Sequence, residues 1–238
     1  MKDSFYIKET YSTNELLWEM LRSYDLPEGF VAYADFQTAG KGQHGNSWES
    51  ENRKNLLFSI LLYPHHIPLN ENFLLSQSAG IGIKQELDKY VENISIKWPN
   101  DIYHNDSKIT GILIENSLQG ATIKESVIGI GININQTGFD NAPNPVSLKQ
   151  ITGKTYARKS LLKNVRENIL NIYNNWTPSQ IHQEYMQSLY RKDGFHPYRS
   201  GNDTFEAKIT DIQPDGRLIL QTKEGSRLSF YFKEVQFL

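Results

Sequence analysis

The stretch Lys97-Trp98-Pro99-Asn100-Asp101-Ile102-Tyr103 decides how the middle of this chain folds. Apolar and polar residues alternate from Ile94 to Trp98, which is typical of a half-buried strand. Pro99 ends that strand because it has no N–H to donate to a neighbour, and the asparagine and aspartate that follow suit a turn. Residues 102–103 and 109–115 are then expected to form a hairpin with a polar tip at 104–107.

This hairpin gathers polar side chains around one rigid turn. Lys97, Asn100 and Asp101 come from the turn, and Lys108 starts the return strand. The spacing alone leaves two interpretations open, a plain hairpin with solvated charges or a functional site.

The composition excludes several classes of function. The 238 residues carry a formal net charge of −2, so no basic surplus favours a nucleic-acid partner. The absence of cysteine excludes disulfides, thiolate catalysis and Cys-ligated zinc. The first residues lack the apolar core of a signal peptide, and no run approaches the roughly 20 apolar residues of a membrane span. We therefore expect a cytoplasmic protein with neither DNA nor a membrane as partner.

The remaining pattern predicts an α+β protein with two domains. Apolar runs at 5–7, 30–36, 55–63 and 125–135 indicate strands, and the nearly continuous apolar run at 55–63 belongs at the centre of a sheet. Helices are expected from Ser12, where Ser12 and Glu15 make a capping box, and at 73–91, 158–176 and 178–190. A linker at 194–202 then leads to a small β-barrel over 205–238, with turns at 215–216 and 223–225. The expected domains are 1–192 and 193–238.

A glycine-rich loop at 37–50 follows the second strand. Gly40, Gly42 and Gly45 surround Lys41 and His44, so the backbone N–H groups of this loop can wrap an anion. A mobile surface loop is the competing interpretation. Trp48 argues against it, because a large aromatic residue at the end of a polar loop needs a surface to cover.

Three stretches in this order resemble the biotin–protein ligase family, and the resemblance covers essentially the whole chain. They are the glycine loop ending in Trp48, then Lys97 to Asp101 with Lys108 and Gly111, and then the strand Gly129-Ile130-Gly131-Ile132-Asn133. The second stretch is specific to the family and the glycine loop is weaker. The resemblance implies a class II synthetase-like mixed sheet with helices on one side, plus a small SH3-like C-terminal barrel. Since the chain begins at the matching region, no N-terminal helix-turn-helix is expected.

The family reaction implied by this resemblance has two steps. The carboxylate of biotin attacks the α-phosphate of ATP, which gives biotinyl-5′-AMP and pyrophosphate. A lysine of a biotin carboxyl carrier protein, or of that domain in a biotin-dependent carboxylase, then attacks the acyl group and AMP leaves. Both nucleophiles come from the substrates, so the protein has to position them and neutralise phosphate charge. ATP, biotin and Mg²⁺ are the expected ligands, and the protein is expected to be a monomer or a homodimer.

The resemblance also assigns roles to single residues. Lys108 and Lys41 are the expected catalytic residues, and Asp101 is expected at the magnesium end of the phosphates. Contacts to biotin are expected from Ser12, Thr13, Asn14, Gln37, Lys41, Gly42, Gln43, Lys108 and Gly111. Contacts to ATP are expected from Trp48, Asn100, Asn133 and Lys97.

The chain departs from the family in the glycine loop. Relatives often carry Gly-Arg-Gly-Arg-Arg-Gly, where this sequence has Gly40-Lys41-Gly42-Gln43-His44-Gly45. Fewer guanidinium groups imply a weaker hold on the phosphate. Two alternatives stay open at this point: a lipoate–protein ligase, which shares the adenylation chemistry, and a non-catalytic biotin or nucleotide binder.

Overall fold

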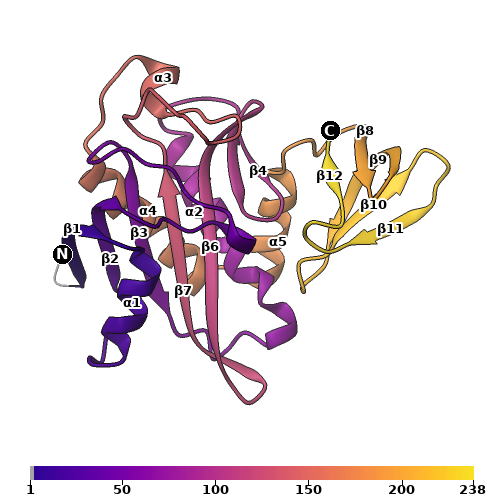
Figure 1. The fold of residues 1–238 in the computed structure, drawn as a ribbon. Coiled ribbons are helices and arrows are strands. Elements are labelled where there is room, and N and C mark those ends of the chain that lie inside the picture. Colours follow the sequence, from indigo (N-terminus) through magenta and orange to yellow (C-terminus); the bar gives the residue numbers. More distant parts are fainter. Residues whose placement is uncertain (1–2) are drawn as a thin grey trace.

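The computed structural model describes residues 3–238, which form two β-sheets and five α-helices (Figure 1). The larger sheet has the strand order β1-β2-β3-β7-β6-β5-β4. Its strands are β1 (Ser4–Thr10), β2 (Val31–Gln37), β3 (Leu56–Leu62), β4 (Ile94–Lys97), β5 (Asp101–His104), β6 (Ser107–Gln119) and β7 (Thr122–Ile132). Only β1 and β2 pair in parallel, which confirms the predicted mixed sheet.

The helices cover the sheet unevenly. They are α1 (Thr13–Leu21), α2 (Phe73–Leu87), α3 (Leu148–Thr152), α4 (Arg158–Asn175) and α5 (Pro178–Gln187). The core side chains of β3 that include Phe58 and Ile60 share one buried cluster with α2 and α4, as the prediction of helices on one side requires. Leu17 of α1, by contrast, packs on the opposite face against Ala32 and Leu61. Every residue of β3 is buried because both of its faces are covered.

The predicted hairpin exists, and its two strands are longer than predicted. Strands β4, β5 and β6 follow one another as antiparallel neighbours, with a turn at Asn105 and Asp106. Strand β6 runs past the predicted 109–115 to Gln119 and pairs along its length with β7, which spans Thr122–Ile132 where 125–135 was predicted. The capping box at Ser12 was wrong, because Ser12 is the N-cap residue of α1 but its side chain makes no capping bond. Glu15 instead pairs with Lys41.

The C-terminal part is a five-stranded antiparallel sheet of order β11-β10-β9-β8-β12. Its strands are β8 (His196–Ser200), β9 (Asp203–Ile212), β10 (Leu218–Thr222), β11 (Arg227–Phe230) and β12 (Gln236–Phe237), so the predicted linker contains a strand. The turns at 215–216 and 223–225 lie where predicted.

Trp98 joins the C-terminal sheet to the larger sheet. Its indole Nε1 donates to the backbone oxygen of Gly216 at 2.8 Å, and its ring packs edge-on against Phe232. The backbone N–H of Phe73 also donates to Pro214, at 3.3 Å. The tryptophan of the motif that organises the hairpin therefore fastens the C-terminal sheet beside it. None of the helices within residues 3–238 combines the length and apolar character that a membrane crossing requires.

Candidate active site

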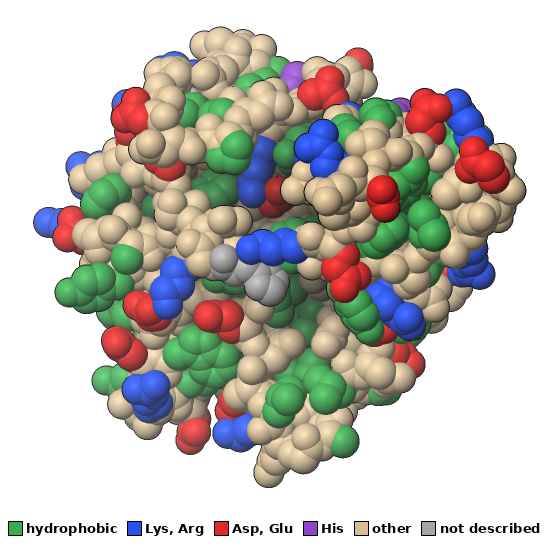
Figure 2. Space-filling model, turned by 45° about the vertical axis from the view of Figure 1, so that its right-hand side comes forward, with side chains coloured by type: hydrophobic (Ala, Val, Ile, Leu, Met, Phe, Trp, Pro, Cys, Tyr) green, Lys and Arg blue, Asp and Glu red, His purple; other side chains and the backbone are tan. Residues whose placement is uncertain are grey.

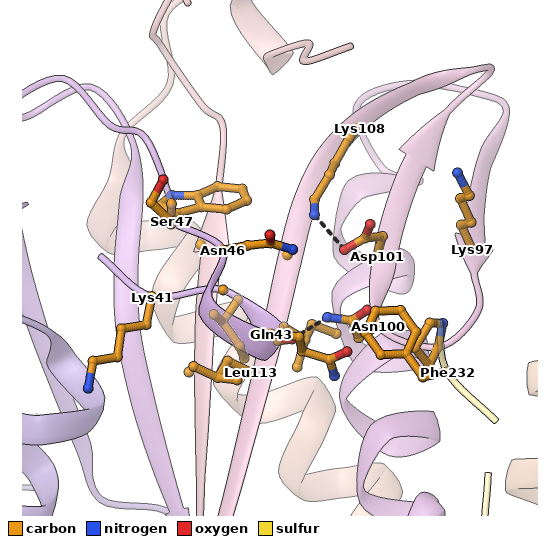
Figure 3. Close-up of a pocket in the computed structure, with 18 of the residues that line it drawn as sticks. Lys41, Gln43, Asn46, Ser47, Lys97, Asn100, Asp101, Lys108, Leu113 and Phe232 are labelled. Carbon is orange, nitrogen blue, oxygen red and sulfur yellow. Dashed lines mark hydrogen bonds and ion pairs between the residues drawn. The ribbon is translucent and has the colours of Figure 1, made fainter. Parts of the chain in front are cut away.

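A cavity of about 620 Å³ lies over the middle of β6 and β7 (Figures 2 and 3). The glycine loop and α1 form one side, and the turn at 98–101 and the C-terminal sheet form the other. Thirteen of the predicted site residues line it: Ser12, Thr13, Asn14, Gln37, Lys41, Gly42, Gln43, Trp48, Lys97, Asn100, Asp101, Lys108 and Gly111. Asn133 is the exception and lines a smaller neighbouring cavity.

The start of α1 forms a polar wall of this cavity. Gln37 Oε1 accepts from the backbone N–H of Thr13 at 2.7 Å and from its hydroxyl at 3.1 Å. Ser59 Oγ lies within hydrogen-bond distance of both Thr13 Oγ1 and Asn14 Oδ1, at 2.8 and 2.5 Å. Asn14 donates its amide to Glu115 at 2.8 Å. Buried polar groups need such partners, so this network fixes the wall before any ligand arrives.

Two glycines of the sheet make room for Trp48. A Cβ atom at Gly111 would lie 2.8 Å from the tryptophan ring, and one at Gly131 would lie 2.6 Å from its Nε1. The ring therefore rests directly on the backbone of β6 and β7, which only glycine permits at these positions. In the same way, Asn14 occupies the space that a side chain at Gly129 would fill.

Lys108 and Asp101 form the charged centre. Lys108 Nζ lies 2.6 Å from Asp101 Oδ1 and 5.8 Å from the centre of the Trp48 ring (Figure 3). Both side chains are partly exposed to the cavity. The amide of Asn100 donates to the backbone oxygen of Ile112 at 2.7 Å, and this bond holds the turn that carries Asp101 against β6.

The other two predicted lysines point elsewhere. Lys41 pairs with Glu15 of α1, and its ammonium points away from Lys108 and Asp101 (Figure 3). Lys97 Nζ donates to the hydroxyl of Tyr103 at 3.0 Å and faces the rings of Tyr103 and Phe237. Burial lowers the pKa of Lys97 below its usual value, although the charge of Asp101 opposes this effect.

Two groups of residues at the site were missed by the sequence analysis. Ser59 and Glu115 complete the polar wall, and nothing in an apolar strand or an exposed hairpin marks such residues in advance. The C-terminal sheet, which the sequence analysis left without a site, lines the cavity with Phe232, Lys233, Val235, Gln236 and Phe237.

The charge of the cavity favours an anionic ligand. Lys41, Lys97, Lys108 and Lys233 line it, and Asp101 is the one carboxylate among its described lining residues. Within residues 3–238, the buried atoms Gln43 Oε1, Trp48 Nε1 and Asn133 Oδ1 have no hydrogen-bond partner. Such groups are costly to bury unpaired, so these atoms indicate places where a ligand supplies the partner.

The smaller cavity adjoins the first across Trp48 and Lys108. Its volume is about 70 Å³, and Asn133, Glu49 and the loop at 139–145 complete its walls. Glu49 accepts from the backbone N–H groups of Asp140, Asn141 and Ala142 at 2.8, 2.8 and 3.0 Å. These bonds, led by that from Asp140, hold the pKa of Glu49 below its usual value.

Comparisons with known proteins agree with this geometry. Residues 6–133 match the Biotin/lipoate A/B protein ligase family, and residues 198–238 match the Biotin protein ligase C terminal domain, which confirms the predicted SH3-like unit. The "Bifunctional ligase/repressor BirA" of Bacillus subtilis is 31% identical over 224 residues, which are 90% of this chain and 68% of that protein. Its counterpart from Bacillus spizizenii is 30% identical over 229 residues, 92% of this chain and 69% of that one.

A solved structure agrees over the full length. The biotin protein ligase from Aquifex aeolicus in complex with biotin and ATP superposes with a TM-score of 0.79 at 26% identity, covering 100% of both chains. The family match spans more than half of the chain and the structural match spans all of it. The chain therefore belongs to the biotin protein ligase family.

Proposed function

We propose that this enzyme activates biotin with ATP to biotinyl-5′-AMP and transfers the biotinyl group to a lysine of a biotin carboxyl carrier protein or domain. The observation that carries the proposal is the position of Lys108 and Asp101. They share one lysine-lined cavity with the polar wall at the start of α1, whose cavity-lining side chains Ser12, Thr13 and Asn14 are uncharged. A neutral polar head group fits the wall, and an acyl phosphate fits the lysine.

Substrate placement follows from the chemistry of the two ends. The ring system of biotin lies against Ser12, Thr13, Asn14 and Gln37, whose side chains are uncharged. Those of Thr13, Asn14 and Gln37 are held by hydrogen bonds to one another and to Ser59. Its carboxylate then reaches Lys108. The adenosine lies over Trp48 toward Asn133, where buried polar atoms lack partners in the described part of the chain.

The first step needs charge neutralisation more than acid–base chemistry. A carboxylate oxygen of biotin bonds to the α-phosphorus, and the α–β bridging P–O bond breaks. Pyrophosphate leaves with the electron pair. Lys108 exchanges its contact with Asp101 for the carboxylate and an α-phosphate oxygen, where its charge stabilises the crowded transition state.

The second step uses the same site. The uncharged amine of the acceptor lysine attacks the acyl carbon, the C–O bond to the phosphate breaks, and AMP leaves. The amine releases its extra proton to solvent. Lys108 again neutralises charge, this time on the departing phosphate of AMP.

Magnesium fits this site only as an ion shared with ATP. Among the described residues no group of three or more acidic or histidine side chains could hold a metal. Mg²⁺ commonly takes one or two carboxylates together with substrate phosphates and water, and Asp101 supplies one carboxylate. The ion would screen charge on the departing pyrophosphate.

A pyrophosphate-release assay tests the proposal. The protein is incubated with ATP and either biotin or lipoate, and release with biotin alone is expected. Release with lipoate would instead make the protein a lipoate–protein ligase, and release with neither would leave a non-catalytic binder. Mass spectrometry of an added carboxyl carrier domain then detects the transferred biotinyl group.

We also propose that the boundary between the two domains lies at residues 192–193. The cation–π contact of Lys97 with Phe237 and the hydrogen bond of Trp98 to Gly216 cross that boundary, so both parts take part in one site.

A further inference from the structure

Glu49 connects two loops that are far apart in the sequence. It directly follows Trp48 at the end of the glycine loop, and its carboxylate accepts three consecutive backbone N–H groups at 140–142. Oε1 takes the N–H of Asp140, and Oε2 takes those of Asn141 and Ala142. Hydrogen bonds to an ionised acceptor are about twice as strong as neutral ones.

The segment held by Glu49 also reaches the catalytic lysine. The backbone N–H of Lys108 donates to Asn144 O at 2.8 Å, and Val146 N donates to Lys108 O at 2.9 Å. The loop is thus fixed to β6 at one end and to the glycine loop at its middle. Any shift of Glu49 is transmitted to both.

The two loops enclose the smaller cavity, whose volume of about 70 Å³ is well below the roughly 300 Å³ of a small ligand pocket. A nucleotide base can occupy this smaller cavity only if the loops move. Because the carboxylate of Glu49 bonds the two loops together, we expect a movement of one loop to displace the other. When biotin orders the glycine loop from the larger cavity, the loop at 139–145, which lines the smaller cavity, is then held in place as well.

We infer that Glu49 is a positioning residue that couples biotin binding to nucleotide binding by holding the 140–142 backbone to the glycine loop. The inference rests on the proposed function, since it assigns the two ends of the site to biotin and ATP. Glu49 touches neither reacting atom in this assignment and acts through the loops.

A thermodynamic cycle with a conservative substitution tests the coupling. Glu49→Gln keeps the shape of the side chain but places an NH₂ group opposite at least one backbone N–H. The dissociation constant of α,β-methylene-ATP, whose α–β linkage cannot be cleaved and which therefore cannot transfer its adenylyl group to biotin, is measured with and without saturating biotin. We expect biotin to tighten nucleotide binding at least about fivefold in the natural protein, the lower end of common coupling. Glu49→Gln should abolish most of that gain and leave biotin affinity alone within about twofold.

Hydrogen exchange supplies a readout that a purely structural role would not move. In the natural protein, biotin alone should protect the amides at 140–142, although these residues do not line the larger cavity. The protection should vanish in Glu49→Gln and return in Glu49→Asp, which restores the charge. Glu51→Gln is the matched control, since it removes an exposed carboxylate two residues away.

The outcomes of these two experiments separate a failure of the inference from a failure of the proposed function. Equal coupling and equal protection in Glu49→Gln overturn the inference, even if the protein releases pyrophosphate normally. A natural protein that binds biotin and nucleotide without any coupling overturns it as well. If the natural protein fails to bind biotin, the proposed function fails first and takes the inference with it. A melting temperature within a few degrees of the natural protein shows that Glu49→Gln is folded. If that variant does not fold, the natural protein decides the question, because the absence of biotin-dependent protection at 140–142 overturns the inference.

Discussion

Lys108 Nζ lies 2.6 Å from the carboxylate of Asp101, on the neighbouring strand of the same hairpin. The ion pair holds the ammonium of Lys108 over the cavity. A substrate phosphate would take the place of the Asp101 carboxylate as the anionic partner of this lysine. Partly exposed pairs of this kind are worth little by themselves, and the exchange therefore costs little.

Loss of the Lys108 ammonium should abolish most adenylation. Lys108→Ala is expected to lower the rate of pyrophosphate release at least about a hundredfold, which is the scale for removing one charge-stabilising donor. Circular dichroism should show an unchanged fold because the side chain is not part of the core. Lys124→Ala is the control, since Lys124 is an exposed lysine paired with Glu125. Near-normal turnover in Lys108→Ala would end the assignment.

Trp48 should contribute to nucleotide binding through stacking. Base–aromatic stacking is worth roughly 1–3 kcal/mol, so Trp48→Ala should weaken the binding of α,β-methylene-ATP by that amount in calorimetry. Biotin binding should change little. Equal loss for both ligands would show that Trp48 serves the structure instead.

Gly131→Ala should reproduce the effect of Trp48→Ala without touching the tryptophan. A methyl group at Gly131 overlaps the indole and must displace it from the sheet. Gly138→Ala is the matched control, because a Cβ at Gly138 meets its nearest neighbour at an ordinary 3.9 Å. Full nucleotide affinity in Gly131→Ala would mean that the resting position of the ring is irrelevant to binding.

Gln43 should limit how long the intermediate is retained. It lines the cavity, and its Oε1 is buried and lacks a partner in the described chain. A charged donor binds a phosphate more strongly than an amide, so Gln43→Arg should slow the release of biotinyl-5′-AMP in stopped-flow fluorescence of Trp48. It should also protect the loop amides in the complex. An unchanged release rate with unchanged protection would show that position 43 does not contact the intermediate.

Asp35 should make the fold sensitive to acid. Burial alone would raise its pKa, but bonds from Tyr6, Arg158 and Arg53 outweigh burial and lower the pKa from 3.8 to about 2. The folded state therefore gains stability above about pH 4, on the order of 2 kcal/mol, and loses it as the pH falls toward 2.

Urea unfolding measures this contribution. The difference in unfolding free energy between the natural protein and Asp35→Asn should be largest near neutral pH and shrink toward pH 2. The exposed acid in Asp25→Asn serves as the control. A difference that does not change with pH would contradict a depressed pKa at Asp35.

The sequence brought Lys108 and Asp101 together correctly because their contact is local, and their roles in the reaction stay predictions. Lys108 and Asp101 lie on adjacent strands of one short hairpin, and proline and turn residues make that hairpin readable. The central strand β3 was readable for a similar reason, since burial on both faces leaves a continuous apolar run.

The failures have a common cause. The Ser12–Glu15 box is a local pattern, and a lysine from a distant loop takes the carboxylate that the pattern needs. Glu49 and Ser59 owe their roles to contacts between segments dozens of residues apart, which leave no periodic trace in the chain. The strand β8 was missed because its glycine and proline neighbours resemble a linker.

One wall of the larger cavity is formed by Phe232, Lys233 and neighbouring residues of the C-terminal part. The C-terminal sheet therefore cannot be exchanged for that of another protein without changing the lining of the cavity. A chimera that carries the corresponding sheet of a relative would have different side chains lining this cavity. The hydrogen bond of Trp98 to the C-terminal sheet would hold those side chains against the larger sheet. Such a hybrid would need matching substitutions on both sides of this contact, because the cavity is shared by the two sheets.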